Sequence, residues 1–449
     1  MATMRFAVAG IIVFVASIVL AGEVRAGRGG SSGDDAALAA ADAYIQSGRR
    51  GPARVRVPVA PGTAVHVRLK RHAFHFGINI TGTFNRFLIE GAPAMSDAGR
   101  FQSFVLDHFN TVVPSNGGKW LYTEGVRDFV TMEYIDLMLR WAARHQMFAR
   151  MHTMLWDTEQ QPAWVIDLLT AAAGGDAAAK ADLRRAIDRR IDYYLRDRAG
   201  GYQELDVLNE SAHHPRYTDV FGWAGIADIF NGAARTARDA GVPLRLFLNE
   251  YNVLQSSRDP RKGPTAPLDP AAGWYRREVE AVRAAGGAVS GVGVQYYADP
   301  RVAIETPHSA ARIAIALRNL TATGLPVELT EFGIRKGGSH AEAARILGET
   351  MRMVFGTPGT TGFVMFGFWA GAIWDTAPDA VLVDNDWKLT EAGAAYEKLM
   401  AAWSTDVTVP VAADGTIAFT GFYGDYTLET PGRTLSFELV KGKIAYDLR

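Results

Sequence analysis

Two stretches of the chain have the same pattern: Leu205-Asp206-Val207-Leu208-Asn209-Glu210 and Val327-Glu328-Leu329-Thr330-Glu331. Each is mainly apolar, as a buried strand is, and each ends in a glutamate. In a parallel barrel, a strand of this kind delivers its last residue to the C-terminal rim, where barrel enzymes keep their chemistry. The two stretches therefore predict a pair of carboxylates at the rim of a parallel barrel.

Strand-like runs recur along the chain and alternate with helical patterns, which extends the prediction to a whole fold. The runs cover residues 74–80, 109–113, 148–156, 205–209, 244–248, 289–296, 327–330 and 362–368. Helical patterns, with apolar residues three and four apart, cover residues 132–146, 179–196, 222–240, 271–285, 309–323 and 340–355. Eight strands alternating with helices predict an α/β fold, a (β/α)8 TIM barrel over residues 71–402. In this order Glu210 ends the fourth strand and Glu331 the seventh.

The two ends of the chain predict an accessory module outside the barrel. Residues 53–70 alternate between apolar and polar side chains, which is typical of half-buried strands. Residues 403–449 contain further strand patterns separated by Gly and Asp, without helices. We expect these N- and C-terminal strands to pack together as one small β-module.

The first residues predict export of the protein. Arg5 precedes an apolar run over residues 6–20, and Val24-Arg25-Ala26 offers small residues to a signal peptidase, so residues 1–26 are interpreted as a signal peptide. The expected location is secreted or periplasmic. A bilayer span needs about 20 residues, so a retained membrane anchor is the less favoured alternative. Residues 27–52 are expected to be a flexible segment followed by a short helix over residues 36–44.

Composition limits the classes of partner and chemistry. The 449 residues carry a formal net charge of -1, which gives no electrostatic basis for binding nucleic acid or an anionic membrane. A neutral polymer is a better match for this nearly balanced charge than either of those partners. Cysteine is absent, which excludes disulfides, thiolate metal sites and cysteine nucleophiles. We expect a monomer without a cofactor.

Paired glutamates are the groups that glycoside hydrolysis requires. One carboxyl group protonates the leaving oxygen, and the other attacks the sugar or activates water. A single glutamate at a strand end is more often salt-bridged or solvated. Here there are two, and Asn209, beside Glu210, is suited to hold a sugar hydroxyl. A gap of roughly 5 to 5.5 Å between the carboxyl groups would indicate retention, and a larger gap inversion.

The sequences around both glutamates resemble glycoside hydrolase family 10, the retaining endo-β-1,4-xylanases. Residues 206–210 are similar to the family's W-D-V-V-N-E, and residues 328–331 to the start of I-T-E-L-D. The resemblance runs from about Phe74 to Tyr396. It implies that Glu210 is the acid/base, that Glu331 is the nucleophile, and that Asn209 binds a 2-hydroxyl.

Other segments resemble the family's substrate subsites. Residues 109–120 are similar to F-N-x-V-T-x-E-N-x-M-K-W, which implies that Asn116 and Lys119 bind the sugar on the non-reducing side. Residues 152–156 are similar to H-T-L-V-W, which places His152 and Trp156 next to the cleaved bond. The strand-six motif G-V-G-L-Q-S-H implies that Gln295 and Tyr297 lie near the nucleophile. Trp374 matches a tryptophan that stacks on a pyranose ring. Tyr251 and Asn252, in a segment similar to Y-N-D-Y-N, are expected to be structural.

Several departures from the family motifs fall in the expected cleft. Ser115 replaces the glutamate of E-N-x-M-K-W, Tyr297 stands in place of the strand-six histidine, and Phe366 replaces a tryptophan. A phenol donates one hydrogen bond to a carboxylate but does not become cationic at neutral pH. The substrate is therefore less constrained than the reaction. It is xylan or another β-linked polymer, such as an exopolysaccharide or a glucan, and a catalytically silent glycan-binding barrel is the remaining alternative.

Two expectations concern protons and metals. Glu210 needs a raised pKa to act as an acid near neutral pH, and the charge of Glu331 is a plausible cause. His213 and His214 resemble a metal-binding pair, but no third ligand has suitable spacing, so we expect no metal.

Overall fold

The structure is a computed structural model that describes residues 31–80, 87–198, 200–269, 272–298, 308–335, 339–373 and 381–448. The predicted signal peptide and Trp374 lie outside these residues. Within the described part of the chain, no helix combines the length and apolar character needed to cross a membrane.

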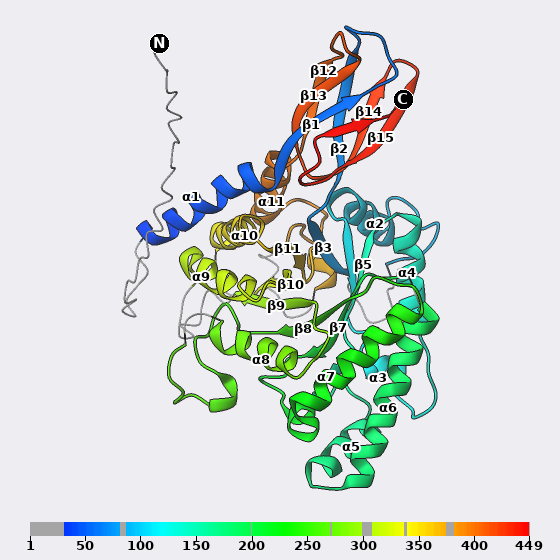
Figure 1. Cartoon of the computed structure of the whole chain (residues 1–449), viewed down its shortest axis with the longest axis vertical. Helices are drawn as coiled ribbons and strands as arrows, with labels where there is room; N and C mark the ends of the chain where they lie inside the picture. Colours follow the sequence, from blue (N-terminus) through cyan, green and yellow to red (C-terminus); the bar gives the residue numbers. More distant parts are fainter. Residues whose placement is uncertain are drawn as a thin grey trace, which may run out of the picture.

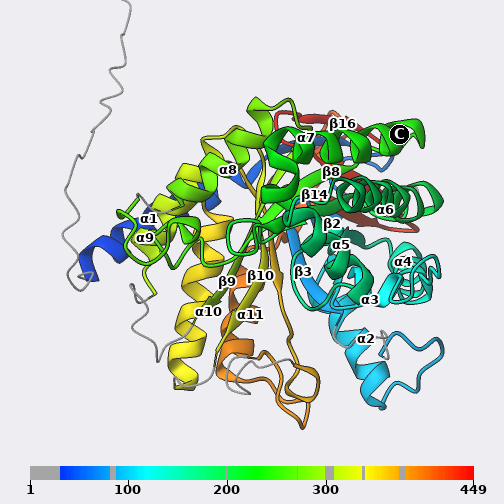
Figure 2. The same cartoon turned by 90° about the horizontal axis from the view of Figure 1, so that it is seen from below.

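Parallel strands form the closed barrel at the centre of the molecule (Figures 1 and 2). The sheet order is β5-β4-β3-β11-β10-β9-β8-β7-β6, and β5 also pairs with β7, which closes the ring. The strands are β3 His75–Ile80, β4 Thr111–Pro114, β5 Phe148–Met151, β6 Leu155–Trp156, β7 Glu204–Asn209, β8 Arg245–Glu250, β9 Gly291–Ala298, β10 Val327–Ile334 and β11 Thr360–Met365. Because β5 and β6 are two pieces of the predicted third strand, interrupted at residues 152–154, the predicted eight-stranded barrel is confirmed.

Helices surround the barrel, as the alternating pattern predicted (Figure 2). They are α2 Asp97–His108, α3 Trp120–Thr123, α4 Glu133–Arg144, α5 Ala163–Ala173, α6 Ala177–Leu195, α7 Arg216–Asp239, α8 Gly273–Ala284, α9 Ala310–Thr321, α10 His340–Phe355 and α11 Glu391–Ala402. Side chains cap several N-termini, as Ser309 does by accepting from Arg312 N. Helix α7 begins at Arg216, before the predicted start at Gly222. The backbone kinks at Gly222, where φ is 65°. Glycine adopts this left-handed conformation without steric cost.

A β-sandwich built from both ends of the chain stands above the barrel (Figure 1). One sheet has the order β13-β1-β16 and the other the order β12-β2-β14-β15. The strands are β1 Arg50–Arg56, β2 Ala64–His72, β12 Asp406–Pro410, β13 Thr416–Phe422, β14 Gly424–Thr430, β15 Arg433–Leu439 and β16 Ala445–Asp447. Val55, Val67 and Leu428 are fully buried in it. The predicted accessory module is therefore confirmed.

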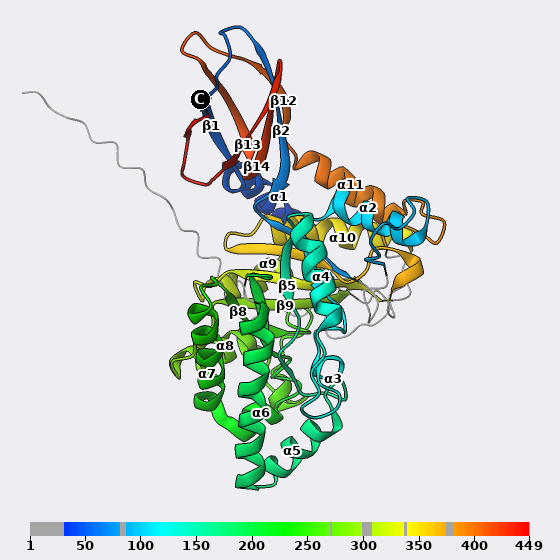
Figure 3. The same ribbon diagram turned by 90° about the vertical axis from the view of Figure 1, so that its right-hand side faces the viewer.

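Helix α1, Ser31–Gly48, is longer than the predicted helix over residues 36–44. Residues 31–35, expected to be flexible, belong to this helix because tertiary contacts hold them. Asp34 accepts hydrogen bonds from the Ser309 hydroxyl at 2.6 Å and from Ala311 N at 2.9 Å. Helix α1 thus packs beside α9 and α10 (Figures 1 and 3). Strand β1 also begins at Arg50, three residues before the predicted boundary.

Candidate active site

A cleft of about 530 Å³ opens at the C-terminal ends of the barrel strands. Its walls come from most of the strand ends, so residues far apart in sequence meet there. The cleft brings together eight of the predicted site residues: Asn116, Lys119, His152, Trp156, Glu210, Gln295, Tyr297 and Glu331. Asn209 is fully buried at the end of β7, directly before Glu210. The strand ends therefore place the predicted carboxylates in one cavity.

Glu210 follows the last residue of β7 in a tight turn. Its backbone has φ 56°, a left-handed conformation that is rare for a residue with a side chain and that recurs at functional sites. The carboxylate accepts hydrogen bonds from Trp156 Nε1 at 2.6 Å and from Gln295 Nε2 at 2.9 Å. Only 7% of Glu210 is exposed. The turn and two donors hold the carboxylate in one orientation.

Glu331 lies within β10 rather than at its end, which corrects the predicted strand boundary. Strand β10 continues to Ile334 because Phe332 and Ile334 are buried and pair with β9. A shift in pairing register between Leu329 and Glu331 interrupts the regular alternation at this point. The carboxylate accepts a hydrogen bond from the Tyr297 hydroxyl at 2.6 Å. Tyr297 therefore occupies the position that the sequence assigned to it.

Burial raises the pKa of both glutamates. The pKa of Glu331 rises to about 8, with the hydrogen bond from Tyr297 opposing the rise and the charge of Glu210 adding to it. The pKa of Glu210 is also raised, first by burial and then by the charge of Glu250. The direction expected for Glu210 is confirmed, but burial and Glu250 rank above Glu331 as causes. Because the two groups interact, they titrate as a pair.

Lys119 supplies a positive charge beside the carboxylates. Its ammonium donates to Asn116 Oδ1 at 2.8 Å and to Gln160 Oε1 at 2.7 Å, and it lies 4.5 Å from the centroid of the Trp156 ring. Burial lowers its pKa to about 8, while the charges of Glu331 and Glu210 act in the opposite direction. Asn116, Lys119 and Trp156 therefore form one connected wall of the cleft.

A polar layer beneath the cleft orients the side chains that line it. His152 Nδ1 lies 3.0 Å from Asp206 Oδ2, and His152 Nε2 lies 3.9 Å from Glu331 Oε1. Burial lowers the pKa of His152, which favours the neutral imidazole. Asn209 Oδ1 accepts from Asn249 Nδ2 at 2.9 Å, while Asn209 Nδ2 has no hydrogen-bond partner among the described residues. The amide nitrogen is buried, and Asn209 is not among the residues that line the cleft.

Further residues line the cleft without having been singled out as site residues in the sequence. They are Asn79, Gln160, His214 and Arg335, together with Tyr251, which was expected to be structural. No family motif marked Asn79, and His214 was considered only as a possible metal ligand. Gly333, at the aspartate position of I-T-E-L-D, is another departure, and it pairs in register with Tyr297. The chain therefore differs from the family motifs at two positions beside the nucleophile, Tyr297 and Gly333.

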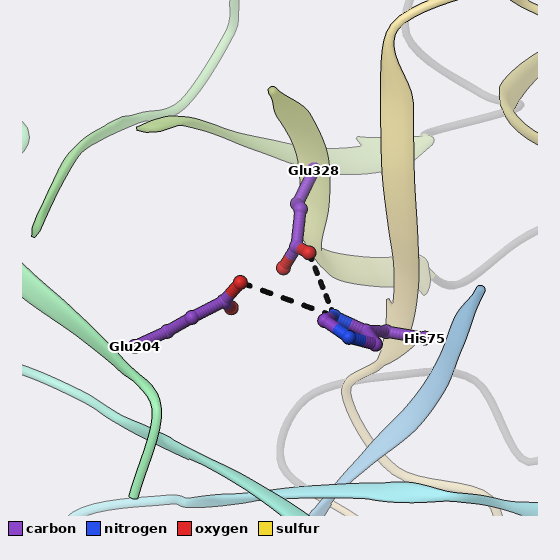
Figure 4. Close-up of side chains that lie close together, drawn as sticks. All are labelled: His75, Glu204 and Glu328. Carbon is purple, nitrogen blue, oxygen red and sulfur yellow. Dashed lines mark hydrogen bonds and ion pairs between the residues drawn. The ribbon is translucent and has the colours of Figure 1, made fainter. Parts of the chain in front are cut away.

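A second polar cluster lies at the opposite, N-terminal end of the barrel (Figure 4). His75, Glu204 and Glu328 place their ligand atoms within 4.8 Å of one another, a spacing that a metal ion could use. Arg150 Nη1 lies 2.9 Å from Glu204, and Arg245 Nη2 lies 2.5 Å from it. His75 Nδ1 lies 2.8 Å from Glu328. Because the two arginines place positive charge beside the buried carboxylates, we interpret the cluster as an ion network that joins the strands.

The adjacent histidines after β7 contact two different carboxylates. His213 Nδ1 lies 2.8 Å from Glu250 Oε1, whereas His214 Nε2 lies 3.6 Å from Glu210 Oε2. His214 therefore belongs to the cleft. His213 instead stacks on the Tyr251 ring at a centroid distance of 3.8 Å.

Comparisons with known proteins agree with this geometry. A family model described as glycosyl hydrolase family 10 matches residues 81–402. The anti-sigma-I factor RsgI6 of Acetivibrio thermocellus is 28% identical over 390 residues, which cover 86% of this chain and 44% of that protein. Endo-1,4-beta-xylanase 3 of Arabidopsis thaliana is 27% identical over 364 residues, which cover 79% of this chain and 43% of that protein. The chain thus spans less than half the length of these curated relatives.

Solved structures share the barrel. The xylanase 10B of Thermotoga petrophila, crystallised with xylobiose, aligns with a TM-score of 0.58 and 18% identity over 74% of this chain and 94% of its own. The native xylanase 10B of Thermotoga maritima aligns with the same score and identity, over 74% of this chain and 95% of its own. At this identity the likeness concerns the fold.

Proposed function

The chain belongs to glycosyl hydrolase family 10, and from this membership and the cleft we propose that it is a retaining glycoside hydrolase that cleaves a β-1,4-linked polysaccharide, with xylan as the first candidate. The observation that carries the proposal is the convergence of Glu210 and Glu331 in one cleft, each held by hydrogen-bond donors. A cleft that only bound glycans would not require two buried carboxylates whose charges interact.

The proposed reaction has two steps. In the first, Glu331 attacks the anomeric carbon while Glu210 donates its proton to the leaving glycosidic oxygen, so one C–O bond forms as another breaks. In the second, Glu210 takes a proton from water, and the resulting oxygen nucleophile displaces Glu331 from the sugar. The enzyme is regenerated with its proton on Glu210.

The surroundings of the two carboxylates support this division of roles. The nucleophile must be ionised; burial opposes this at Glu331, and the Tyr297 hydroxyl and the charge of Lys119 act against burial by favouring the ionised form. The acid must be protonated, and burial of Glu210 favours the neutral form. Because like charges resist joint ionisation, deprotonation of Glu331 itself helps to keep the proton on Glu210.

The test is reducing-sugar release from xylan by Glu331→Ala and Glu210→Ala. We expect each variant to lose at least about 10² of kcat, because general acid–base groups alone contribute 10²–10⁴. Glu280→Ala, which removes an exposed carboxylate from the outer helix α8, is the matched control. Wild-type turnover by either cleft variant would contradict the proposal.

A second candidate keeps the reaction and changes the polymer. Ser115, Tyr297 and Phe366 all line the cleft, and each departs from a family motif. These changes alter the surface that the sugar contacts, whereas both carboxylates are retained. Product analysis on xylan, a β-glucan and a bacterial exopolysaccharide separates the candidates, because only the true substrate gives oligosaccharides at low enzyme concentration.

A silent glycan-binding barrel is the alternative from another class. The names of the relatives include both an anti-sigma-I factor and xylanases, so they leave this choice to experiment. Binding of polysaccharide without any release of reducing ends would favour the silent barrel. Reducing-end release that disappears in Glu331→Ala would favour the enzyme.

Export of the protein is also proposed, from the N-terminal sequence. Arg5 and the apolar run over residues 6–20 form the pattern that secretory signals share. N-terminal sequencing of protein recovered from the periplasm or medium should begin after Ala26. An intact Met1 on cell-associated protein would contradict cleavage and favour a retained anchor.

A further inference from the structure

The side chain of Arg335 lies at the edge of the proposed catalytic cleft. It directly follows the last residue of β10, the strand that carries Glu331, and it lines the cleft. Its guanidinium carbon lies 5.8 Å from the centroid of the Tyr297 ring. Because the Tyr297 hydroxyl donates to Glu331, one aromatic side chain connects the arginine to the nucleophile. Arg335 is therefore close to where a bound sugar reacts.

The charge of Arg335 is not neutralised by the described residues around it. Arg335 is exposed, and its guanidinium lies over the face of an aromatic ring rather than beside a carboxylate of the described residues. Lys119, the other basic residue that lines the cleft, differs because it is buried and donates to two side-chain amides. An arginine held over an aromatic ring keeps its hydrogen-bond donors free for a ligand.

The cleft has few negative charges to oppose this cation. Glu210 and Glu331 are the acidic residues that line it in the described part of the chain, and the repulsion between their charges opposes joint ionisation. Two positions where the family motifs carry a carboxylate hold Ser115 and Gly333. With Lys119 and Arg335 both charged, the cleft favours an anionic ligand over a neutral one.

We propose that Arg335 determines specificity by binding the carboxylate of a uronic acid unit attached to, or part of, the polysaccharide chain. The inference rests on the proposed glycosidase function and names its substrate class, an acidic β-linked polysaccharide. A guanidinium presents parallel N–H donors that match the two oxygens of a carboxylate. The arginine acts on the bound substrate and takes no part in bond cleavage.

The experiment compares one polymer with and without its charge. Glucuronoxylan is the first substrate, and the second is the same preparation with its carboxyl groups reduced to alcohols. The wild-type protein should have kcat/KM about 5- to 10-fold higher on the acidic form, a modest factor because the site is open to solvent and salt. Arg335→Gln should bring this ratio to about 1, and Arg335→Lys should retain part of it.

Arg318→Gln is the matched control, because it removes an exposed arginine from the outer helix α9 and should leave both the ratio and the activity at wild-type values. A wild-type ratio near 1, or an unchanged ratio in Arg335→Gln, would overturn the inference while leaving the glycosidase proposal intact. Inactivity on every polymer would instead contradict the glycosidase. In that case, Kd values for acidic and reduced oligosaccharides test the role of Arg335. The wild-type protein should bind the acidic form more tightly, and Arg335→Gln should lose this preference.

Discussion

Replacing Tyr297 by phenylalanine should move the acidic limb of the pH profile to higher pH. The Tyr297 hydroxyl donates to Glu331 at 2.6 Å, and this hydrogen bond lowers a pKa that burial otherwise raises. Phenylalanine keeps the ring and removes the donor. Because Glu331 must be ionised to attack, a higher pKa means that activity is lost at a higher pH as the solution is acidified.

The size of the shift follows from the strength of the lost bond. A hydrogen bond to a charged group contributes about 1.5–3 kcal/mol. At 1.36 kcal/mol per pKa unit, removing it raises the pKa of Glu331 by roughly one to two units. Starting from a pKa of about 8, kcat/KM at neutral pH should fall by about 10- to 100-fold, with a smaller loss in alkaline solution.

The assay is kcat/KM for a soluble xylo-oligosaccharide measured across the pH range, since this parameter reports groups of the free enzyme. Tyr297→His provides the opposite perturbation, because a cationic imidazole favours the ionised carboxylate and should move the limb to lower pH. Tyr396→Phe is the control: its buried hydroxyl donates to the His108 carbonyl, outside the cleft. An unchanged acidic limb in Tyr297→Phe, with activity reduced equally at every pH, would refute the reasoning.

Three further perturbations test other parts of the structure. Trp156→Phe removes a 2.6 Å hydrogen bond that lowers the pKa of Glu210, so the alkaline limb of kcat, where the acid loses its proton, should move to higher pH. Arg150→Ala leaves buried carboxylates without their cation and should lower the free energy of unfolding in urea by about 3–5 kcal/mol. Burial opposes ionisation of Glu328, but the charge and hydrogen bond of His75, together with the charges of Arg150 and Arg245, hold the pKa of Glu328 well below 4.5. Its contribution to stability is therefore fully present above the unfolded pKa and is lost as the pH falls through the folded one, so Glu328→Gln should flatten the acid side of the stability curve.

The sequence predicted the barrel because strand period and helix period are local properties. Every predicted barrel strand is present, and Glu210 lies where its strand ends. The end of β10 was predicted too early because Glu331 is polar, whereas the structure continues the strand through buried Phe332 and Ile334. The two glutamates are equally buried, and what separates them is the backbone: Glu210 turns away with φ 56°, whereas Glu331 continues to pair with β9.

Tertiary contacts explain what local patterns missed. The first turn of α1 is held by Asp34 against the N-terminus of α9, a contact between residues far apart in the chain. Arg335 had no motif to mark it, because its significance depends on lying over the ring of Tyr297. Likewise, the charge of Glu250 raises the pKa of Glu210 because β7 pairs with β8, which the local sequence does not reveal.

The most direct test of the central claim is azide rescue of the two glutamate variants on an aryl β-xylobioside with a good leaving group. If Glu331 is the nucleophile and Glu210 the acid/base, Glu210→Ala still forms the covalent intermediate, and azide should release a β-glycosyl azide. Glu331→Ala should instead give the α-azide, because azide then replaces the missing nucleophile. The configuration of each product can be read by NMR. An α-azide from Glu210→Ala, or a β-azide from Glu331→Ala, would contradict the assigned roles.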